Sequence, residues 1–532
     1  MNTVKLAMLE TAHIGVESFE QFYKTIFKRL GYETKVFRVG ANDETSHAGS
    51  GIFENESIDV FVSDLSLGKQ DTYDGLTVIK KIKRIYPNLL VIANSMTNVT
   101  FVEAASHIPS FDLFVCKSKM SDKVYQDYIV SKLKGIFKRN VYLDECDLEL
   151  NKSKLFRKKK DRLQLIDILK SITFTSHNID EFTAVKRIIL SPIFGGYSDS
   201  EVFRLSAFTS SNLKCINAVL KVSSNESYLE ERDNYLKYVK WYLPYTWRPE
   251  LIGCAETRDF GALCYSFVYN DEVPFKSLTE CLRDKNDEKL EIAIDSIFDP
   301  KHQRWYHKNN IQKGIDLTGY YYNKWFFDRI TNEQEFCSII RNIGEVRENA
   351  VLINEHLYPR PQGYLLGIPR KEHSTCICHG DLNSNNVLVS DNSCISFIDF
   401  QNTKRGHVFE DFVVFEVCIR LYVNFNETIS TQINDEWELN KASLNRSCDY
   451  AVQNNSTRKR SIYPQILKLR KYANLNAPEE SDINYYYALA LYCFRLLRID
   501  SFHDWQKGQV VSCLLSAERM VEFLENGACD KT

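Results

Sequence analysis

The sequence contains little glycine and proline, 21 and 12 of its 532 residues, and this scarcity excludes collagen-like and low-complexity chains. It has no excess of one charge either, because 67 lysines and arginines nearly balance 70 aspartates and glutamates to give a net charge of −3. Such a chain has no overall field that would attract nucleic acid or anionic lipid. We therefore do not expect nucleic acid as a partner.

Long apolar runs and regular cysteine pairs are also absent. The longest apolar runs, such as Tyr485–Phe494, fall far short of the ~20 residues that a membrane span needs. The first residues lack the charged and apolar regions of a secretory signal. The 15 cysteines are scattered without a CxxC pair. These features predict a cytoplasmic protein with reduced thiols and no membrane span.

Hydrophobic residues, by contrast, make up 44% of the chain, which is enough to build the cores of about three domains at this length. Residues 1–139 alternate between apolar and amphipathic segments. We expect strands over Val4–Leu9, Thr34–Val39, Ile58–Val62, Leu89–Ala93 and Leu113–Cys116, with helices over Glu17–Leu30 and Leu76–Ile85. Apolar strands separated by helices predict a flavodoxin-like α/β domain, a parallel sheet covered on both faces.

Polar side chains follow four of these strands, namely Glu10, Asp64, Ser95 and Lys117. Because the carboxyl ends of parallel strands meet at one edge of a sheet, we expect these side chains to share a site. Asp64 is a candidate nucleophile toward a phosphoryl group. Glu10 and Asp64 have the oxygen ligands that Mg²⁺ prefers, whereas Ser95 and Lys117 could bind the phosphoryl oxygens.

Residues 3–139 resemble a response-regulator receiver domain in the segments VFVSDLSLG, YDGL, VIANSMT and LFVCKSK. The resemblance implies a phosphoacceptor at Asp64, a switch made of Ser95, Phe114 and Lys117, and a place in a two-component phosphorelay. It allows two partners, a cognate histidine kinase and a second copy of the chain bound through the receiver. The alternative is a flavodoxin-like domain in which these groups are ordinary polar loop residues.

Residues 140–180 contain the polar stretch Leu148–Arg162, which is rich in lysine and arginine. We expect a solvated linker that leads into a helix. Nucleic-acid binding is the alternative, but only Phe156 interrupts the basic residues with an aromatic ring.

Residues 181–270 have strand patterns over Glu201–Ser206, Ala218–Val222 and Leu263–Val268, with one helix over Glu226–Leu243. Residues 271–532 are mostly helical, apart from a hairpin around His379–Phe400. This hairpin region reads HGDLNSNNVLV…FIDF. Phosphoryl transfer needs a group that orients the acceptor hydroxyl and oxygen ligands for Mg²⁺. Asp381 is the candidate for the first role, and Asn386 and Asp399 are candidates for the second.

These motifs resemble the aminoglycoside phosphotransferase and choline kinase families more than standard protein kinases. The resemblance implies a two-lobed α+β protein kinase-like fold, with a nucleotide lobe and a largely helical C-terminal lobe. It also implies that Lys221 pairs with the phosphates of ATP, that Glu231 pairs with Lys221, and that a loop containing Gly195, Gly196 and Ser198 covers the phosphates. A plain hairpin turn and an exposed strand-end lysine are the alternatives for that loop and for Lys221.

For two further features, we favour a structural role over a role in substrate binding. His407 could contact a substrate, but we expect a surface histidine. The aromatic run from Tyr320 to Phe327 could line an acceptor pocket, but its helical spacing favours a role in the core.

The sequence thus predicts a receiver domain that regulates an ATP- and Mg²⁺-dependent phosphotransferase, which acts on the hydroxyl of an unidentified acceptor. The alternative is a catalytically weak nucleotide-binding protein in which both domains serve as docking modules.

Overall fold

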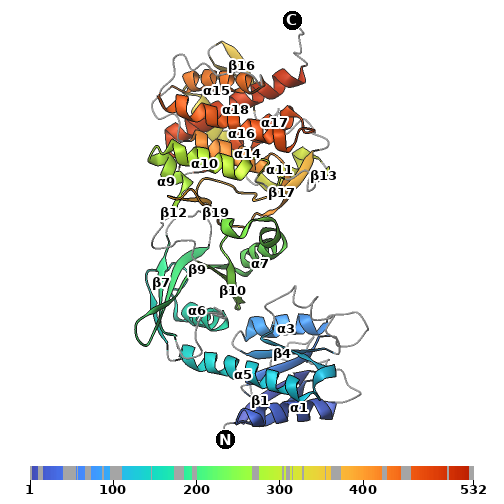
Figure 1. Cartoon of the computed structure of the whole chain (residues 1–532). Helices are drawn as coiled ribbons and strands as arrows, with labels where there is room; N and C mark the ends of the chain where they lie inside the picture. The colour runs from blue at the N-terminus through green and yellow to red at the C-terminus, as the bar shows by residue number, and fades with distance from the viewer. Residues whose placement is uncertain are drawn as a thin grey trace. The chain divides into compact units, whose positions relative to one another are not determined.

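In the computed structural model the chain forms two compact units, each described here by itself (Figure 1). Unit 1 consists of Met1–Leu229 and Glu250–Phe267, and unit 2 consists of Glu230–Pro249 and Val268–Thr532. The structure describes residues 3–9, 16–39, 56, 58–65, 74–86, 89–95, 111–144, 146–172, 185–193, 200–266, 275–301, 305–306, 312–313, 316–325, 329–353, 355–360, 373–421, 428–444, 457–499 and 502–526. In these ranges, every helix is too short or too polar to span a membrane.

The N-terminal part of unit 1 contains a five-stranded parallel sheet with the strand order β2-β1-β3-β4-β5. Its strands are β1 (Thr3–Leu9), β2 (Glu33–Val39), β3 (Val60–Asp64), β4 (Leu90–Ser95) and β5 (Leu113–Cys116). Its helices include α1 (Val16–Arg29), α3 (Asp74–Ile85) and α5 (Lys123–Asp144). This is the flavodoxin-like strand order, and all five expected strands are confirmed.

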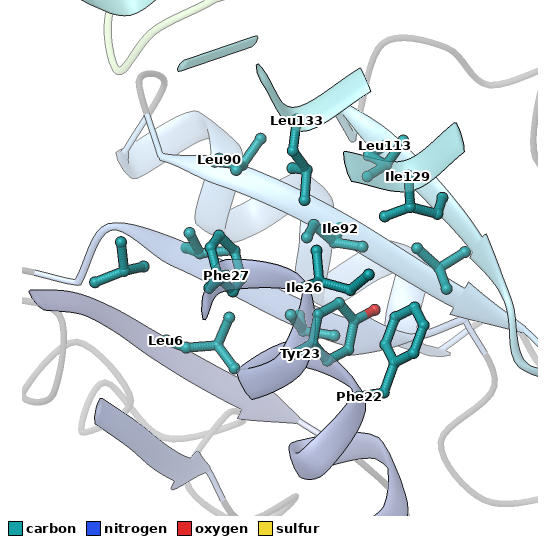
Figure 2. Packing of buried hydrophobic residues seen from close by; sticks show 14 of the residues in the cluster. Leu6, Phe22, Tyr23, Ile26, Phe27, Leu90, Ile92, Leu113, Ile129 and Leu133 are labelled. Atoms are coloured by element: carbon teal, nitrogen blue, oxygen red, sulfur yellow. The ribbon is translucent and has the colours of Figure 1, made fainter. Parts of the chain in front are cut away.

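Successive residues of the strands face opposite sides of the sheet, so each strand contributes to two cores. Leu6 of β1 lies in a cluster with Tyr23 and Phe27 of α1 and Leu133 of α5, which Figure 2 shows from close by. Its neighbour Ala7 lies in a second cluster on the other side of the sheet, against α3. The central strands β1, β3 and β4 are mostly buried because helices cover both faces, whereas the edge strand β2 is only partly buried.

A second sheet in unit 1 has six strands in the order β10-β11-β9-β8-β7-β6. Its strands are β6 (Asp147–Leu150), β7 (Val185–Pro192), β8 (Glu201–Thr209), β9 (Lys214–Ser224), β10 (Leu251–Glu256) and β11 (Phe260–Ser266). All neighbouring pairs are antiparallel except β6 and β7, which are parallel. The expected β-rich segment is therefore present, with more strands than the sequence indicated.

Part of the stretch that we expected to be a solvated linker belongs to this sheet. β6 begins only three residues after α5 ends, and the helix α6 (Lys159–Ser171) lies between β6 and β7 in the chain. Ile168 and Leu169 of α6 lie in one buried cluster with residues of β7, β8, β9, β10 and β11. The basic side chains are exposed, as expected, but the backbone around them is an edge strand and a packed helix.

The chain passes from unit 1 into unit 2 along the helical segment that follows β9. This segment consists of α7 (Asn225–Asn234), a π-helical turn (Tyr235–Val239) and α8 (Lys240–Tyr242), and it confirms the single helix expected there. A short 3₁₀ turn, η5 (Tyr245–Trp247), follows it.

Unit 2 is mainly helical (Figure 1). Its described helices are α9 (Leu278–Arg283), α10 (Asp287–Phe298), α11 (Leu317–Trp325), α12 (Arg329–Ile340), α14 (Glu410–Arg420), α15 (Ile429–Leu444), α16 (Thr457–Asn476), α17 (Asp482–Leu496) and α18 (Asp504–Glu525). From Asp411 onward, the described residues form helices and no strand, as the sequence predicted.

Three small antiparallel sheets accompany these helices. They consist of β12 (Phe275–Ser277), β18 (Val387–Ser390) and β19 (Ile395–Phe397); β13 (Gln312–Lys313), β17 (Ser374–Cys378) and β20 (Lys404–His407); and β14 (Glu345–Val346), β15 (Ala350–Ile353) and β16 (His356–Pro359). The expected hairpin is β18–β19, whereas the third sheet was not expected.

Candidate functional sites

The carboxyl edge of the parallel sheet brings together three of the four expected polar groups. Asp64 ends β3, Ser95 ends β4, and Lys117 directly follows β5. The Nζ atom of Lys117 lies 2.6 Å from Oδ2 of Asp64, and these side chains are only 6% and 13% exposed. Ser95 is buried at 7% exposure. Lys117 and Asp64 therefore form an ion pair that is largely shielded from solvent and would be screened little by salt.

The backbone around Asp64 explains the glycine of the YDGL motif. A Cβ atom placed on Gly75, near the start of α3, would overlap the main-chain oxygen of Asp64. Glycine therefore lets α3 approach the end of β3. Phe114 is partly buried, and its ring centre lies 6.5 Å from that of Phe111. Glu10 lies outside the described residues, so its role stays a prediction.

The loop between β17 and β18 in unit 2 holds Asp381 and Asn386 against each other. Asn386 donates through Nδ2 to the main-chain oxygen of Asp381 at 2.9 Å and lies 3.4 Å from its Oδ2. Asn383 donates to the same Oδ2 at 3.1 Å. Within the described residues, Oδ1 of Asp381 has no bonded partner. The loop thus fixes one carboxylate oxygen and leaves the other for a ligand.

Asp411 of α14 binds the main chain at the start of this loop, a role that the sequence did not assign. Its two carboxylate oxygens accept the main-chain N–H groups of His379 and Gly380 at 2.7 and 2.8 Å, and Tyr306 donates its hydroxyl to Oδ2 at 2.7 Å. Burial raises the pKa of Asp411, and the charge of His379 opposes this shift. Gly380 has a φ of +77°, a conformation that favours glycine at the turn.

Asp399 follows the hairpin β18–β19, two residues after β19 ends. It is a non-glycine residue with a φ of +65°, in the left-handed region. The preceding residue, Ile398, donates its N–H to the main-chain oxygen of Asn386 at 3.1 Å. This bond ties the backbone next to Asp399 directly to the loop between β17 and β18.

The structure describes two of the five predicted nucleotide-binding residues. Lys221 lies within β9, between β8 and β11, and is only 8% exposed, so the alternative of an exposed strand-end lysine is wrong. Glu231 of α7 is 2% exposed. Lys221 belongs to unit 1 and Glu231 to unit 2, and their pairing stays a prediction. Gly195, Gly196 and Ser198 lie outside the described residues.

His407 is fully buried, which corrects the expectation of a surface histidine. Its Nδ1 lies 2.7 Å from the hydroxyl of Tyr321, and its Nε2 lies 3.6 Å from Oε1 of Glu480. Tyr321 is also fully buried, which supports a core role for that part of the aromatic run. Phe326 and Phe327 lie outside the described residues. The sequence near His407 could not indicate that this residue is buried, because its burial depends on packing between distant segments.

Asn386 and Asp399 of unit 2 are the candidate metal ligands. In the part of the chain that the structure describes, no three His, Cys, Asp or Glu side chains cluster to hold a metal. Mg²⁺ usually takes one or two carboxylates together with phosphate oxygens and water. Because the amide nitrogen of Asn386 faces Asp381, its carbonyl oxygen is the end that could hold a cation, and the carboxylate of Asp399 is the second candidate ligand.

Residues 343–432 match the model of a family described as the phosphotransferase enzyme family. These residues include Asp381, Asn386 and Asp399. No curated protein matches the chain.

Three solved structures illustrate what the chain is similar to. An aminoglycoside phosphotransferase from Streptomyces rimosus is 14% identical over 53% of this chain and 92% of that chain, with a TM-score of 0.27. An ethanolamine kinase from Plasmodium vivax is 12% identical over 69% and 92%, with a TM-score of 0.30. The RcsB response regulator from Salmonella typhimurium is 21% identical over 25% and 62%, with a TM-score of 0.20. The chain thus spans 62% of the length of that regulator.

The Streptomyces enzyme has also been solved in complex with ADP and streptomycin. The assignment of this chain depends on the matched segment and on the strand order of unit 1. The chain thus has a segment, residues 343–432, that matches the model of the phosphotransferase enzyme family, and this segment follows an N-terminal five-stranded parallel sheet with the strand order of a receiver-like domain.

Proposed function

We propose that the protein is a receiver-regulated, ATP-dependent phosphotransferase that phosphorylates a hydroxyl group on an acceptor in a signalling pathway. The observation that carries the proposal is the geometry of the loop with Asp381 and Asn386, followed by the hairpin that ends at Asp399. All three residues fall in the segment that matches the phosphotransferase family. The acceptor itself is unidentified.

Asp381 would act on the acceptor hydroxyl. Asn383 and Asn386 donate toward its Oδ2, which orients the carboxylate. The other oxygen, Oδ1, is the atom that would orient the hydroxyl and accept its proton. Positioning of this kind, more than proton transfer alone, accounts for most of the catalysis in phosphoryl transfer.

Asn386 and Asp399 would hold Mg²⁺ through oxygen atoms, and the ion would neutralise charge on the phosphates. Lys221, paired with Glu231, would orient the α- and β-phosphates of ATP. The loop with Gly195, Gly196 and Ser198 would cover the phosphates through main-chain N–H groups and a hydroxyl. The ADP complex of the Streptomyces enzyme supports ATP as the donor nucleotide.

The receiver part would add regulation. Asp64 would accept a phosphoryl group, with Glu10 and Asp64 holding Mg²⁺ and with Ser95, Phe114 and Lys117 responding to the new charge. A cognate histidine kinase and a second copy of the chain are the partners that this role would need.

We divide the chain accordingly into a receiver over 1–139, a connecting segment over 140–180 that adds β6 and α6 to the next sheet, a nucleotide lobe over 181–270, and a helical lobe over 271–532. The cysteines of the described residues are free thiols, which supports our placement of the protein in the cytoplasm.

The test is turnover of Mg²⁺·ATP by the purified full-length protein, with and without Asp381→Asn and Asp399→Asn. We expect Asp399→Asn to lower phosphotransfer by at least about 10²-fold, because metal binding and charge stabilisation provide several kcal/mol. Asp391→Asn is the matched control, since Asp391 lies on the same hairpin with a side chain that is 70% exposed. We expect it to behave as the wild type.

Wild-type turnover in Asp399→Asn would overturn the assignment. A protein that binds ATP but turns it over no faster than Asp381→Asn would instead be the docking module of the alternative interpretation. A screen of a metabolite pool for ATP-dependent phosphorylated products would then identify the acceptor.

A further inference from the structure

We propose that Asn234 and Tyr235 are positioning residues that hold Asp399 in its metal-binding conformation. This inference rests on the proposed function, because that function gives Asp399 its metal. It concerns only contacts within unit 2, to which both ends of the interaction belong.

Asp399 adopts an unusual backbone conformation for its surroundings. Among the described residues, six that are not glycine have a positive φ. Five of them are exposed, where a turn can relax freely: Lys152, Asn212, Lys285, Glu355 and Ser393. Asp399, at +65°, is the one that is not exposed. A strained residue of this kind persists only where the neighbouring structure holds it.

On its N-terminal side, Asp399 is held by the catalytic loop. Ile398 donates its N–H to the main-chain oxygen of Asn386 at 3.1 Å. The main-chain oxygen of Ile398 lies 3.0 Å from Nε2 of His379. Since a carbonyl can only accept, Nε2 must be the donor. Both main-chain polar groups of Ile398 are therefore engaged.

On its C-terminal side, Asp399 is held by the helical segment that contains Asn234 and Tyr235. Asn234 donates through Nδ2 to the main-chain oxygen of Gln401 at 2.6 Å. The ring of Tyr235 packs edge-on against Phe400, with ring centres 5.7 Å apart. Two consecutive residues thus fix the two residues that follow Asp399.

Tyr235 is itself immobilised at its far end. Its hydroxyl donates to the main-chain oxygen of Pro249 and accepts from Arg248, both at 2.7 Å, and the residue is 2% exposed. It also begins the π-helical turn that interrupts the helix. Such turns are rare and are often found at functional sites. The π-helical turn begins at Tyr235, the residue that packs against Phe400 beside Asp399.

Removal of the side-chain N–H donor of Asn234 should therefore weaken metal binding at Asp399. Without this hydrogen bond, the main-chain oxygen of Gln401 is free to turn, and Asp399 can relax from its left-handed conformation. Loss of a group that orients a metal ligand typically costs about 10–100-fold in metal affinity or activity. We expect the fold to survive, because Asn234 is partly exposed.

The experiment measures binding of Mn²⁺ to the full-length protein in the presence of ADP, by electron paramagnetic resonance, together with the Mg²⁺ concentration that half-saturates turnover. The variants are Asn234→Ala and Asn234→Asp, the second being isosteric but without the N–H donor. We expect both to weaken Mn²⁺ binding by about 10-fold or more. Lys237→Ala, an exposed position three residues along the same segment, is the control and should bind Mn²⁺ as the wild type does.

The possible results test the positioning role of Asn234 separately from the proposed function on which it depends. If Asp399→Asn abolishes Mn²⁺ binding but both Asn234 variants bind as the wild type does, the positioning role is wrong and the function stands. If the wild type binds no Mn²⁺ with ADP, the proposed function fails and the positioning role fails with it. If Asn234→Ala and Asn234→Asp melt as the wild type does and lose metal affinity, the inference is supported.

Discussion

At the scale of single residues, Asp411 shows how one buried carboxylate can organise a loop. It accepts two consecutive main-chain N–H groups and one tyrosine hydroxyl. We expect Asp411→Ala to lower the free energy of unfolding by about 2–5 kcal/mol, because buried donors without an acceptor cost roughly 1–3 kcal/mol each. Urea unfolding followed by circular dichroism would measure the loss. A variant as stable as the wild type would show that water replaces the carboxylate without penalty.

Glu480 provides a pH-dependent contribution to stability. Burial would raise the pKa of Glu480, but hydrogen bonding and charge from His407 outweigh burial and lower it from 4.5 to about 2. A lowered pKa means that the ionised form stabilises the fold above pH 4.5, and that this contribution is lost as the pH falls from 4.5 toward 2. We therefore expect Glu480→Gln to melt below the wild type at pH 7, with a gap that narrows below about pH 4.5.

Thermal melting between about pH 7 and pH 3.5 would test this. Glu479→Gln is the control, since its neighbour Glu479 is exposed. A gap that stays constant over this range would contradict the assignment.

Several residues of the candidate sites were predictable because their roles depend on short motifs. Asp64 and Lys117 follow strands whose apolar character is evident, and the structure brings them to 2.6 Å. His407 was predicted wrongly because its partners, Tyr321 and Glu480, are far away in the sequence. Asp411 was not predicted, because its contact with the loop depends on how α14 packs, which no local pattern reveals.

At the scale of elements, the helices of unit 2 share a buried network of charges. Glu416 of α14 accepts hydrogen bonds from Arg470 of α16 at 2.8 and 2.9 Å and from Tyr485 of α17 at 2.6 Å. Arg420 of α14 forms ion pairs with Glu416 and with Glu436 of α15. Two arginines and two glutamates therefore balance their charges inside a bundle of four helices.

Burial would raise the pKa of Glu416, yet Arg470 and Arg420 lower it to about 2. We expect Glu416→Gln to reduce the free energy of unfolding by about 3–5 kcal/mol, because removing one member of a buried ion pair leaves a buried charge without its partner. The urea midpoint would show the effect. Glu438→Gln removes a surface pair with Lys441, whose side chains are 57% and 43% exposed, and should change stability by at most about 1 kcal/mol. Equal effects of the two variants would contradict this.

The elements that were missed are short strands with distant partners. β6 has four residues of mixed polarity, and it pairs with β7 in a register that joins Asp147 to Arg187. Periodicity identifies a half-buried strand only over a longer stretch. The same reason applies to β14, β15 and β16. The strand β4 was predicted from its continuous apolar run, and the helix α1 from an amphipathic pattern that continues over 14 residues.

At the scale of the whole molecule, we expect the receiver to control the phosphotransferase. The motivation is that Asp64 and Asp381, the two residues for which we propose phosphoryl chemistry, belong to different units. Phosphorylation of Asp64 would break or redirect its ion pair with Lys117, a two-state change that can bias a distant site. Coupling of this kind is typically worth 1–3 kcal/mol, so we expect turnover to change about 5–150-fold.

The measurement is ATP turnover with a small phosphodonor and Mg²⁺, for the wild type and for Asp64→Ala. Asp59→Ala is a useful control, since Asp59 lies before β3, at the opposite end of the strand. If the wild type and Asp64→Ala respond identically, the receiver is a docking domain only.

The position of β6 determines where this protein can be cut. A fragment that begins at residue 181 would lack both the edge strand beside β7 and the helix α6, which belongs to one buried cluster with Phe203, Leu205 and Ala207. It would expose an unpaired strand edge and an apolar face, which is the usual cause of aggregation. A fragment that begins at residue 140 would keep both elements. Exchange of this receiver for another would therefore succeed only when the donor sequence ends before β6, so the natural unit of recombination includes a piece that sequence alone would assign to neither domain.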